Sequence, residues 1–219
     1  MSSYIQSVYF DWTNTSIPNR SFSNPVAAHS AIVIFIWSYA GMGTVTGVSD
    51  GTNTYNEVGS KYYPSSTWSC QIFVATDVAA GSPSITFTVT GSYFVVEMLE
   101  YGNASAVDQT AQGYGGASPF SLGPSGMTTQ NDEVVVAGFW SVGIPTAVLP
   151  YTPRINVGNT LDYSNQMIED QDVTSMAAYT ATATCASSGW VGRLVTLKIG
   201  GGPPPPPSAV FPNVSTFWM

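Results

Sequence analysis

The chain has 219 residues, of which 44% are hydrophobic and only 8% are charged, with 5 Lys and Arg against 13 Asp and Glu and a formal net charge of -8. This length can bury a sizeable core in one large all-β domain or two small ones, and the low charge excludes disorder driven by self-repulsion. Because five scattered cations cannot neutralise a row of phosphates, nucleic acid and anionic lipid are not expected as partners.

The regular stretches are rich in Val, Ile, Thr, Tyr and Phe, and no segment repeats apolar residues at helical spacing over three turns. Strand-like segments recur at intervals of about 8 to 15 residues with turn residues between them, which is typical of a sandwich or jelly roll. The composition therefore predicts an all-β, antiparallel, two-sheet β-sandwich of jelly-roll type. In chain order the expected strands are 4–10, 30–39, 44–49, 54–58, 67–75, 84–90, 93–101, 107–112, 127–130, 133–142, 148–157, 166–171, 179–185 and 190–199.

Alternation of side chains predicts which faces of these strands are buried. In 68–74 (WSCQIFV) the even positions are apolar and in 85–90 (ITFTVT) the odd positions are, so both are expected to be half-buried. The runs 31–37 (AIVIFIW) and 134–140 (VVVAGFW) are apolar on both faces and are expected to be covered on both sides. The first run is far shorter than the roughly 20 residues of a membrane-spanning helix, so no membrane insertion is predicted.

Turns and loops are also readable. Asp50-Gly51-Thr52-Asn53 lies between two alternating segments and is expected to form a hairpin or short loop in which Gly51 supplies a positive φ. The Gly-rich segment 113–126 is expected to be the longest loop before the C-terminal region.

The N-terminus and the cysteines bear on the cellular compartment. The first residues (MSSYIQS) have neither a basic nor an apolar region of a secretory signal, so synthesis in the cytoplasm is expected. Cys70 and Cys185 lie far apart in a chain with one histidine and no Cys-x-x-Cys, so neither a zinc site nor a redox motif is expected. Two alternatives stay open for them: buried thiols, or a disulfide formed after release from the cell.

Candidate catalytic groups are few. His29 is the one histidine of the chain and precedes a predicted core strand, so it is expected to be a structural or surface residue. Glu97 and Glu100 differ by an odd number on a predicted strand and therefore point to opposite faces, where they cannot share a substrate. No enzymatic activity and no cofactor are predicted.

A second acidic cluster comprises Glu169, Asp170 and Asp172, which we expect at a strand end beside a solvated turn. Asp170 and Asp172 could share a face there and bind calcium together with backbone carbonyls. Exposed aromatic residues are a further candidate site, because Tyr114 or the pair Tyr62 and Tyr63 could stack on sugars. Aromatic residues in all-β proteins are, however, mostly core residues.

The composition changes abruptly at Gly200, which divides the chain into a sandwich (1–199), a Gly/Pro linker (200–207) and an apolar peptide (208–219). Three glycines give a swivel, and five prolines favour a stiff polyproline II rod of roughly 15 Å. A solvated tail has no reason to be so apolar, so the peptide is expected to bind a neighbouring chain, with folding back on its own domain as the alternative. The predicted partner-binding residues are Val210, Phe211, Val214, Phe217, Trp218 and Met219.

Over about residues 4–199 the chain resembles a family of β-sandwich domains found in bacterial surface or secreted proteins and in phage-encoded proteins, mostly without assigned function. The resemblance lies in strand and turn patterns: IVIFIW at 32–37 with TVTGVSDGTNTY at 44–55, IFVA at 72–75 with DVAAG at 77–81, the segment 96–101, and YTATAT at 179–184 with GWV at 189–191. It implies a jelly-roll-like sandwich and no catalytic residues. Such domains usually belong to exported chains, whereas this chain begins without a signal and ends in the linker and apolar peptide.

Together these features predict a phage virion protein, either a head decoration or a fibre subunit, whose C-terminal peptide docks on a neighbouring chain. The expected partners are further copies of the chain, a major capsid protein or another virion protein, in particles assembled in the host cytoplasm. The alternatives are a carbohydrate-binding or adhesive module at the cell surface, with a glycan as partner, and a subunit of an extracellular filament.

Overall fold

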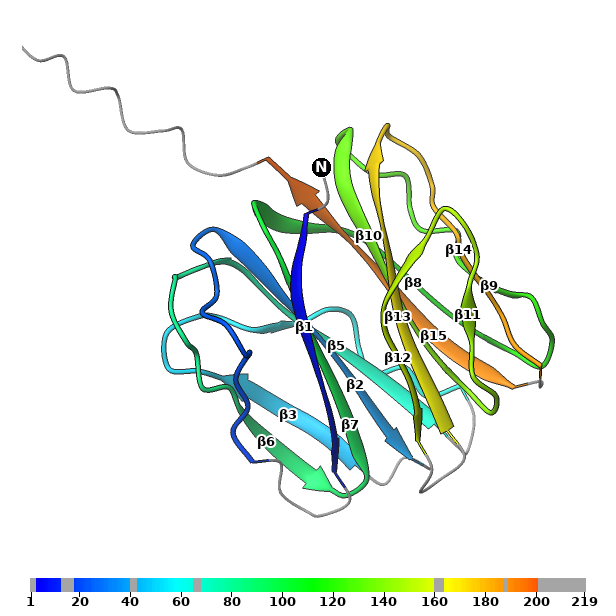
Figure 1. Cartoon of the computed structure of the whole chain (residues 1–219), viewed down its shortest axis with the longest axis horizontal. Helices are drawn as coiled ribbons and strands as arrows, with labels where there is room; N and C mark the ends of the chain where they lie inside the picture. Colours follow the sequence, from blue (N-terminus) through cyan, green and yellow to red (C-terminus); the bar gives the residue numbers. More distant parts are fainter. Residues whose placement is uncertain are drawn as a thin grey trace, which may run out of the picture.

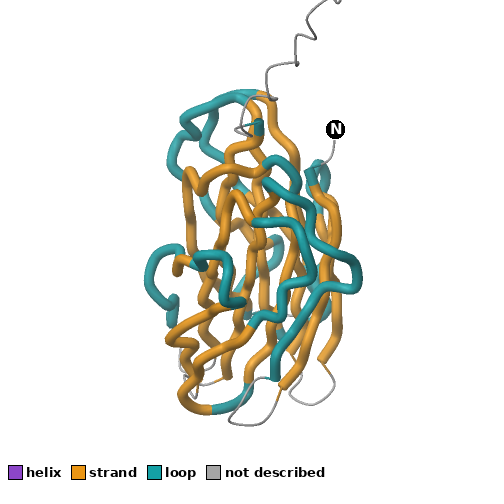
Figure 2. Tube along the Cα trace, turned by 90° about the vertical axis from the view of Figure 1, so that its left-hand side faces the viewer, coloured by secondary structure: helices purple, strands orange, loops and turns teal. Residues whose placement is uncertain are grey.

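The computed structural model describes residues 3–12, 18–39, 43–64, 68–159, 164–186 and 189–200, and in these ranges the chain forms strands and no helix. Accordingly, no helix in the described part could cross a membrane. The strands run mainly along the long direction of the view in Figure 2. Their bounds are β1 (Tyr4–Trp12), β2 (Ser30–Tyr39), β3 (Gly43–Ser49), β4 (Asn56–Glu57), β5 (Trp68–Val78), β6 (Thr86–Gly91), β7 (Phe94–Tyr101), β8 (Ala104–Gly115), β9 (Phe120–Leu122), β10 (Asp132–Ser141), β11 (Thr146–Ala147), β12 (Thr152–Asn159), β13 (Ser164–Thr174), β14 (Ala181–Thr184) and β15 (Trp190–Ile199).

Two five-stranded sheets form the centre of the molecule. The first has the order β1-β7-β2-β5-β4 and the second the order β12-β13-β10-β15-β8, and the strand pairings within them are antiparallel. Apolar side chains from both sheets, among them Phe35, Trp37, Leu99, Val136 and Ile168, meet in one central core. The predicted all-β antiparallel sandwich is therefore confirmed.

Each central sheet is covered on its outer face by a smaller one. The pair β3-β6 packs on the first sheet over a core that includes Ile34, Phe73 and Ile85. The three-stranded sheet β11-β14-β9 packs on the second over a core that includes Phe139 and Met167. Figure 1 shows these layers side by side, with β3 and β6 at the left and β9, β11 and β14 at the right. The molecule thus has four layers where the segment count predicted two sheets.

The second half of the chain repeats the strand order of the first. Replacing β1, β7, β2, β5 and β4 by β8, β15, β10, β13 and β12 converts one central sheet into the other, and the outer pair β3-β6 corresponds to β11-β14. The correspondence extends to β9, which pairs with β14. In the first half, Arg20 takes the place of β9 and forms a single bridge to Ile85, the residue before β6. Each half is a jelly-roll-like unit, and the two units pack together through their larger sheets.

Several predicted strands need correction. No strand forms at 127–130. Thr128 exchanges hydrogen bonds with Ala177, but its neighbours do not continue them into the ladder of backbone hydrogen bonds that a strand requires. Instead β9 lies inside the segment predicted as a loop. The predicted strand 148–157 begins too early: a turn at Pro150, whose ring nitrogen cannot donate to a ladder, separates the short β11, which ends before residue 148, from β12, which begins at Thr152.

The burial predictions hold for three of the four runs considered. The runs 31–37 and 134–140 are buried on both faces, and Thr86, Thr88 and Thr90 alternate outward from a half-buried strand as predicted. The run 68–74 was expected to be half-buried and is buried throughout, because β3 and β6 cover the face that carries its polar residues.

Candidate interaction surface

The predicted partner-binding residues, 210–219, and the linker before them from residue 201 lie outside the described residues. The structure does describe the strand from which they continue. β15 lies between β10 and β8 in the second sheet, and its end is held by further bonds: the Gly200 backbone N–H donates to the Asn103 carbonyl (3.0 Å), and the Gln130 amide donates to the Ile199 carbonyl (3.0 Å). A load on the C-terminal peptide would therefore act on an interior strand with a hydrogen-bonded ladder on each side.

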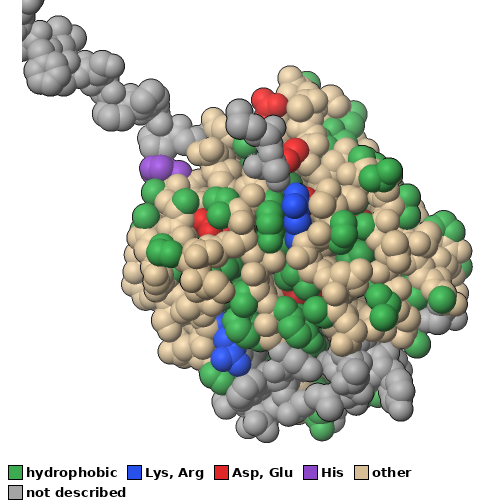
Figure 3. All heavy atoms as spheres, in the orientation of Figure 1, with side chains coloured by type: hydrophobic (Ala, Val, Ile, Leu, Met, Phe, Trp, Pro, Cys, Tyr) green, Lys and Arg blue, Asp and Glu red, His purple; other side chains and the backbone are tan. Residues whose placement is uncertain are grey.

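The surface carries few charges because much of the acidic content lies inside. Among the residues that the structure describes, five carboxyl groups are at most 3% exposed: those of Glu97, Glu100, Glu133, Glu169 and Asp170. The face shown in Figure 3 consists mainly of uncharged polar and backbone atoms with scattered apolar side chains. Such a surface offers hydrogen bonds and small apolar contacts in place of a strong field.

The first acidic pair is divided between two faces of β7, as predicted. Glu97 faces the central core, where its carboxyl accepts a hydrogen bond from the Trp37 indole (2.8 Å) and burial raises its pKa to about 8. Glu100 faces the other side and accepts bonds from the Ala27 backbone N–H (2.7 Å) and the Ser30 hydroxyl (2.9 Å). These carboxyl groups hold the fold together and do not face a common cleft.

The second acidic cluster was placed wrongly at a solvated strand end. β13 continues to Thr174, so Glu169 and Asp170 lie within it and are buried. The single Nε–H of Arg154 is shared between the two carboxyl oxygens of Asp170 (2.9 and 2.8 Å), and Oδ2 also accepts from the Tyr101 hydroxyl (3.0 Å). A guanidinium therefore stands where a calcium ion was considered, and no group of three or more His, Cys, Asp or Glu in the described ranges could hold a metal ion.

His29 joins the start of β2 to the end of β5. Its backbone N–H donates to the Val78 carbonyl (3.0 Å), and its Nδ1 lies 2.7 Å from Oδ1 of Asp77. Both side chains are largely exposed, at 47% and 68%, and both residues have positive φ. This is a surface contact between two strand ends, which agrees with the structural or surface role expected for His29.

The two cysteines are not joined by a disulfide. Cys70 is buried in the central core, and burial raises its pKa. Cys185 is partly exposed and packs against the outer core of the second half. Of the two alternatives, the structure therefore has separate thiols and no disulfide.

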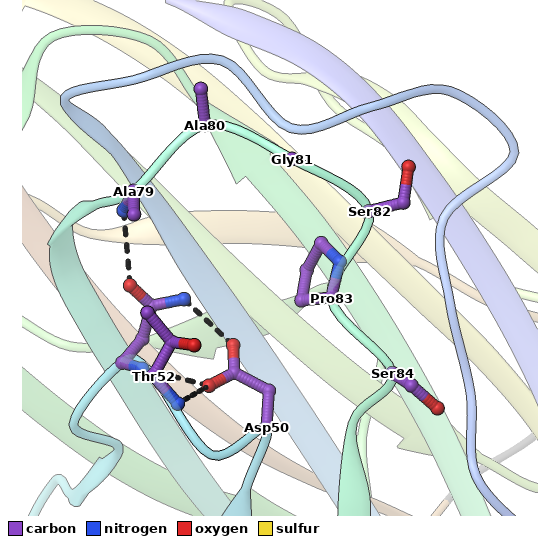
Figure 4. A pocket seen from close by; sticks show the side chains of 9 residues that line it. Asp50, Thr52, Ala79, Ala80, Gly81, Ser82, Pro83 and Ser84 are labelled. Carbon is purple, nitrogen blue, oxygen red and sulfur yellow. Dashed lines mark hydrogen bonds between the residues drawn. The ribbon is translucent and has the colours of Figure 1, made fainter.

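A polar pocket of about 220 Å³ lies between the turn at Asp50 and the segment 79–84. The carboxylate of Asp50 in this pocket accepts four hydrogen bonds from its own loop. Oδ1 accepts from the backbone N–H groups of Thr52 and Asn53 (2.8 and 2.7 Å), and Oδ2 accepts from the Asn53 amide (2.7 Å) and the Tyr55 hydroxyl (3.0 Å). The hydroxyl groups of Ser82 and Ser84 point away from the Asp50 carboxylate (Figure 4). With Gly51 at φ 79°, the predicted turn is confirmed, and its polar groups stabilise the loop.

An aromatic pocket, also of about 220 Å³, lies where β8 and β10 end and β15 begins. Val191 pairs with Tyr114 on one side and with Trp140 on the other, so these three side chains lie in a row across three strands. Trp140 stacks on Trp68 (ring centroids 4.5 Å apart) and Trp190 stacks on Phe120 (5.3 Å), which fixes two walls. The described lining comprises Tyr114, Gly115, Trp140, Val142, Gly189, Trp190 and Val191, with no charged side chain.

Within this pocket Tyr114 is 62% exposed, whereas Trp140 and Trp190 are 7% and 8% exposed. Tyr114 was among the candidates for aromatic stacking; Tyr62 and Tyr63 were the others and are not among its described lining. The two tryptophans were missed, because each belongs to an apolar run that predicts a core strand. The buried indole N–H of Trp140 has no hydrogen-bond partner among the described residues, whereas Trp37, its counterpart on β2, donates to Glu97.

Searches with this chain against family models, curated proteins and solved structures find no match.

Proposed function

We propose that this protein is a structural component of a phage virion, a head decoration or fibre subunit that presents its double sandwich outward and docks through residues 208–219. Its role is binding, not turnover. The observation that carries the proposal is that an uncharged peptide with six large apolar residues continues from β15, an interior strand of a domain with few surface charges. Jelly rolls are common in viral capsid proteins and in lectins, which is consistent with this proposal at the level of the fold alone.

The energetics of docking are adequate. Burying four or five large apolar side chains contributes about 1.5 to 3 kcal/mol each before ordering costs are subtracted. Repetition around a symmetric particle then multiplies weak contacts through avidity. The partner is a further copy of the chain, a major capsid protein or another virion protein, and assembly takes place in the host cytoplasm.

Deletion of residues 208–219 tests the proposal. We expect the truncated chain to be soluble and folded, with the circular dichroism of the full chain, and to be absent from particles purified from the native source. The variant Tyr63→Ala, which removes an exposed aromatic residue of the sandwich, serves as the control and should be incorporated normally. Incorporation of the truncated chain at the level of the full chain would refute the proposal.

A carbohydrate-binding or adhesive module is the second candidate, and the exposed ring of Tyr114 beside two fixed tryptophans favours it. It requires the isolated protein to bind glycans and Tyr114→Ala to abolish that binding. A subunit of an extracellular filament is the third candidate, with its localisation outside the cell in place of the virion.

A further inference from the structure

We infer that the aromatic pocket formed by Tyr114, Trp140 and Trp190 is the socket for the apolar peptide, residues 208–219, of another copy of this chain. The inference rests on the proposed function, because it gives the docking peptide a partner and a site. It makes the protein a head-to-tail self-assembling subunit.

The chemistry of the socket matches the peptide. Its described walls are aromatic and aliphatic side chains and glycine backbone, and the peptide offers Phe211, Phe217 and Trp218 without a charge. A sugar site needs polar groups beside the stacking ring to bind hydroxyl groups, and these walls hold no carboxylate, amide or guanidinium. An aromatic side chain fits the pocket better than a saccharide does.

The socket also has features that suit an extended peptide. Tyr114 and Gly115 end β8, which is an edge strand of the second sheet and can pair with an added strand. The indole nitrogen of Trp140 is itself buried, so the socket meets the peptide with the faces and edges of its rings and with the β8 edge.

The position of the socket points to a different copy as the source of the peptide. The socket lies at Trp190, the first residue of β15, and the peptide's linker leaves from Ile199, the last. Along an extended strand these residues are about 30 Å apart, and β15 runs away from the socket. Three glycines and five prolines reach up to about 25 Å beyond Ile199, so a linker that continues outward carries the peptide toward the opposite pole of the next copy.

The other apolar hollow at the C-terminal side fits the peptide less well. It has about 240 Å³ and is lined by Val173, Thr174 and Ile199 together with three carboxyl groups, those of Asp132, Glu133 and Asp172. Because it includes Ile199 itself, the peptide of the same chain could fill it only if the linker turned back completely. For the peptide of another copy, the acidic rim disfavours it.

A socket at one pole and a peptide at the other form a heterologous interface. Such an interface closes into a ring if the rotation between neighbours allows it and otherwise extends into a filament. Two full-length double variants test the two sides of this interface separately. The socket variant carries Tyr114→Ala and Val142→Glu, and the plug variant carries Phe217→Ser and Trp218→Ser in the apolar peptide, which acts as the plug. The matched control is again Tyr63→Ala, whose ring is 46% exposed outside the described socket.

The experiment is sedimentation velocity on the full chain over a range of protein concentrations. We expect concentration-dependent assembly that the socket variant and the plug variant each weaken by at least about tenfold, and that the control leaves unchanged. Mixing the two variants should give a 1:1 heterodimer that goes no further, because only one intact socket and one intact plug remain in each pair. Circular dichroism and the unfolding midpoint of each variant must match those of the full chain.

Three outcomes would overturn the inference: the full chain stays monomeric, the socket variant assembles as strongly as the full chain, or the two variants do not form the heterodimer. The last outcome is expected if each peptide fills the socket of its own chain. Glycan binding lost only in the socket variant, with no assembly, would assign the pocket to sugars instead. If the truncated chain is excluded from particles while the socket variant enters normally, the peptide binds a different virion chain; the proposed function then stands and the socket does not.

Discussion

At the scale of single residues, Arg193 makes one of the contacts that join the two halves. It lies on β15 of the second half, is 2% exposed, and donates hydrogen bonds to the carbonyl groups of Val58 (2.7 Å) and Ser60 (2.9 Å) in the first half. Gly59 between them has φ +68°, and an added Cβ would lie 2.7 Å from Nη2 of Arg193. The guanidinium and the glycine therefore fit each other.

The first prediction concerns this pair. Arg193→Met leaves the buried carbonyl of Val58 without its donor, while that of the exposed Ser60 can turn to water, so the free energy of unfolding should fall by about 1 to 3 kcal/mol. Gly59→Ala should cost about 1 to 3 kcal/mol through its positive φ and the clash. Because methionine has no guanidinium to clash with, the double variant should lose less than the sum of the two, as measured by urea denaturation. Strict additivity would contradict the proposed contact.

At the scale of elements, a polar cluster links the two central sheets. Asp170 of β13 and Arg154 of β12 belong to the second sheet, and Tyr101 of β7 and Tyr4 of β1 belong to the first. The Arg154 guanidinium lies 4.2 Å from the centroid of the Tyr4 ring. Burial raises the pKa of Asp170 in spite of Arg154, so the carboxylate depends on this cluster for its charge.

Removing the members of this cluster should give graded effects. Asp170→Asn weakens both links and leaves Arg154 without its counter-charge, so it should lower the free energy of unfolding by about 3 kcal/mol. Tyr101→Phe removes one hydrogen bond to a charged group and should cost about 1.5 kcal/mol. Asp172→Asn, at an exposed position on the same strand where the amide oxygen can still accept from Ser3, is the control and should cost less than about 1 kcal/mol. Equal effects of the two Asp substitutions would show that the cluster does not stabilise the sheets.

The elements also show how far the sequence could predict the fold. β2 was predicted with its observed bounds because an uninterrupted apolar run between turn residues leaves one interpretation. The second buried face of β5 was not predicted, because Ser69 and Gln71 look solvent-facing in the sequence. Their polar groups are satisfied by distant partners: Ser69 contacts Ser38 (2.6 Å between hydroxyl oxygens), and the Gln71 amide donates to the Val45 carbonyl (2.9 Å).

The aromatic pocket and the repeated strand order escaped prediction for the same reason. Trp140 and Trp190 each look like core residues in their own strand, and they become walls of a pocket only because three strand ends meet at one pole. The duplication lies in which strands pair, and the paired residues themselves differ: Glu97 in β7 corresponds by register to Arg193 in β15. Local patterns predict strands, whereas such pairings depend on the whole fold.

At the scale of the whole molecule, the buried carboxyl groups predict an unusual dependence of stability on pH. Burial raises the pKa of Glu97 and of Glu169 to about 8, so above their ordinary value of 4.5 the native state holds protons that the unfolded state has lost. Each group then lowers the free energy of unfolding by about 1.4 kcal/mol per pH unit as pH rises toward 8. Asp108 acts oppositely: hydrogen bonds from Thr129 outweigh burial and lower its pKa to about 2, so its contribution is lost as pH falls below 4.

Stability measured by urea denaturation should therefore be greatest near pH 4 to 5 and fall toward pH 8. Glu97→Gln, which keeps an acceptor for the Trp37 indole, should flatten that fall and make the protein more stable than the wild type at pH 8, whereas the same slope in both proteins would show that Glu97 ionises normally.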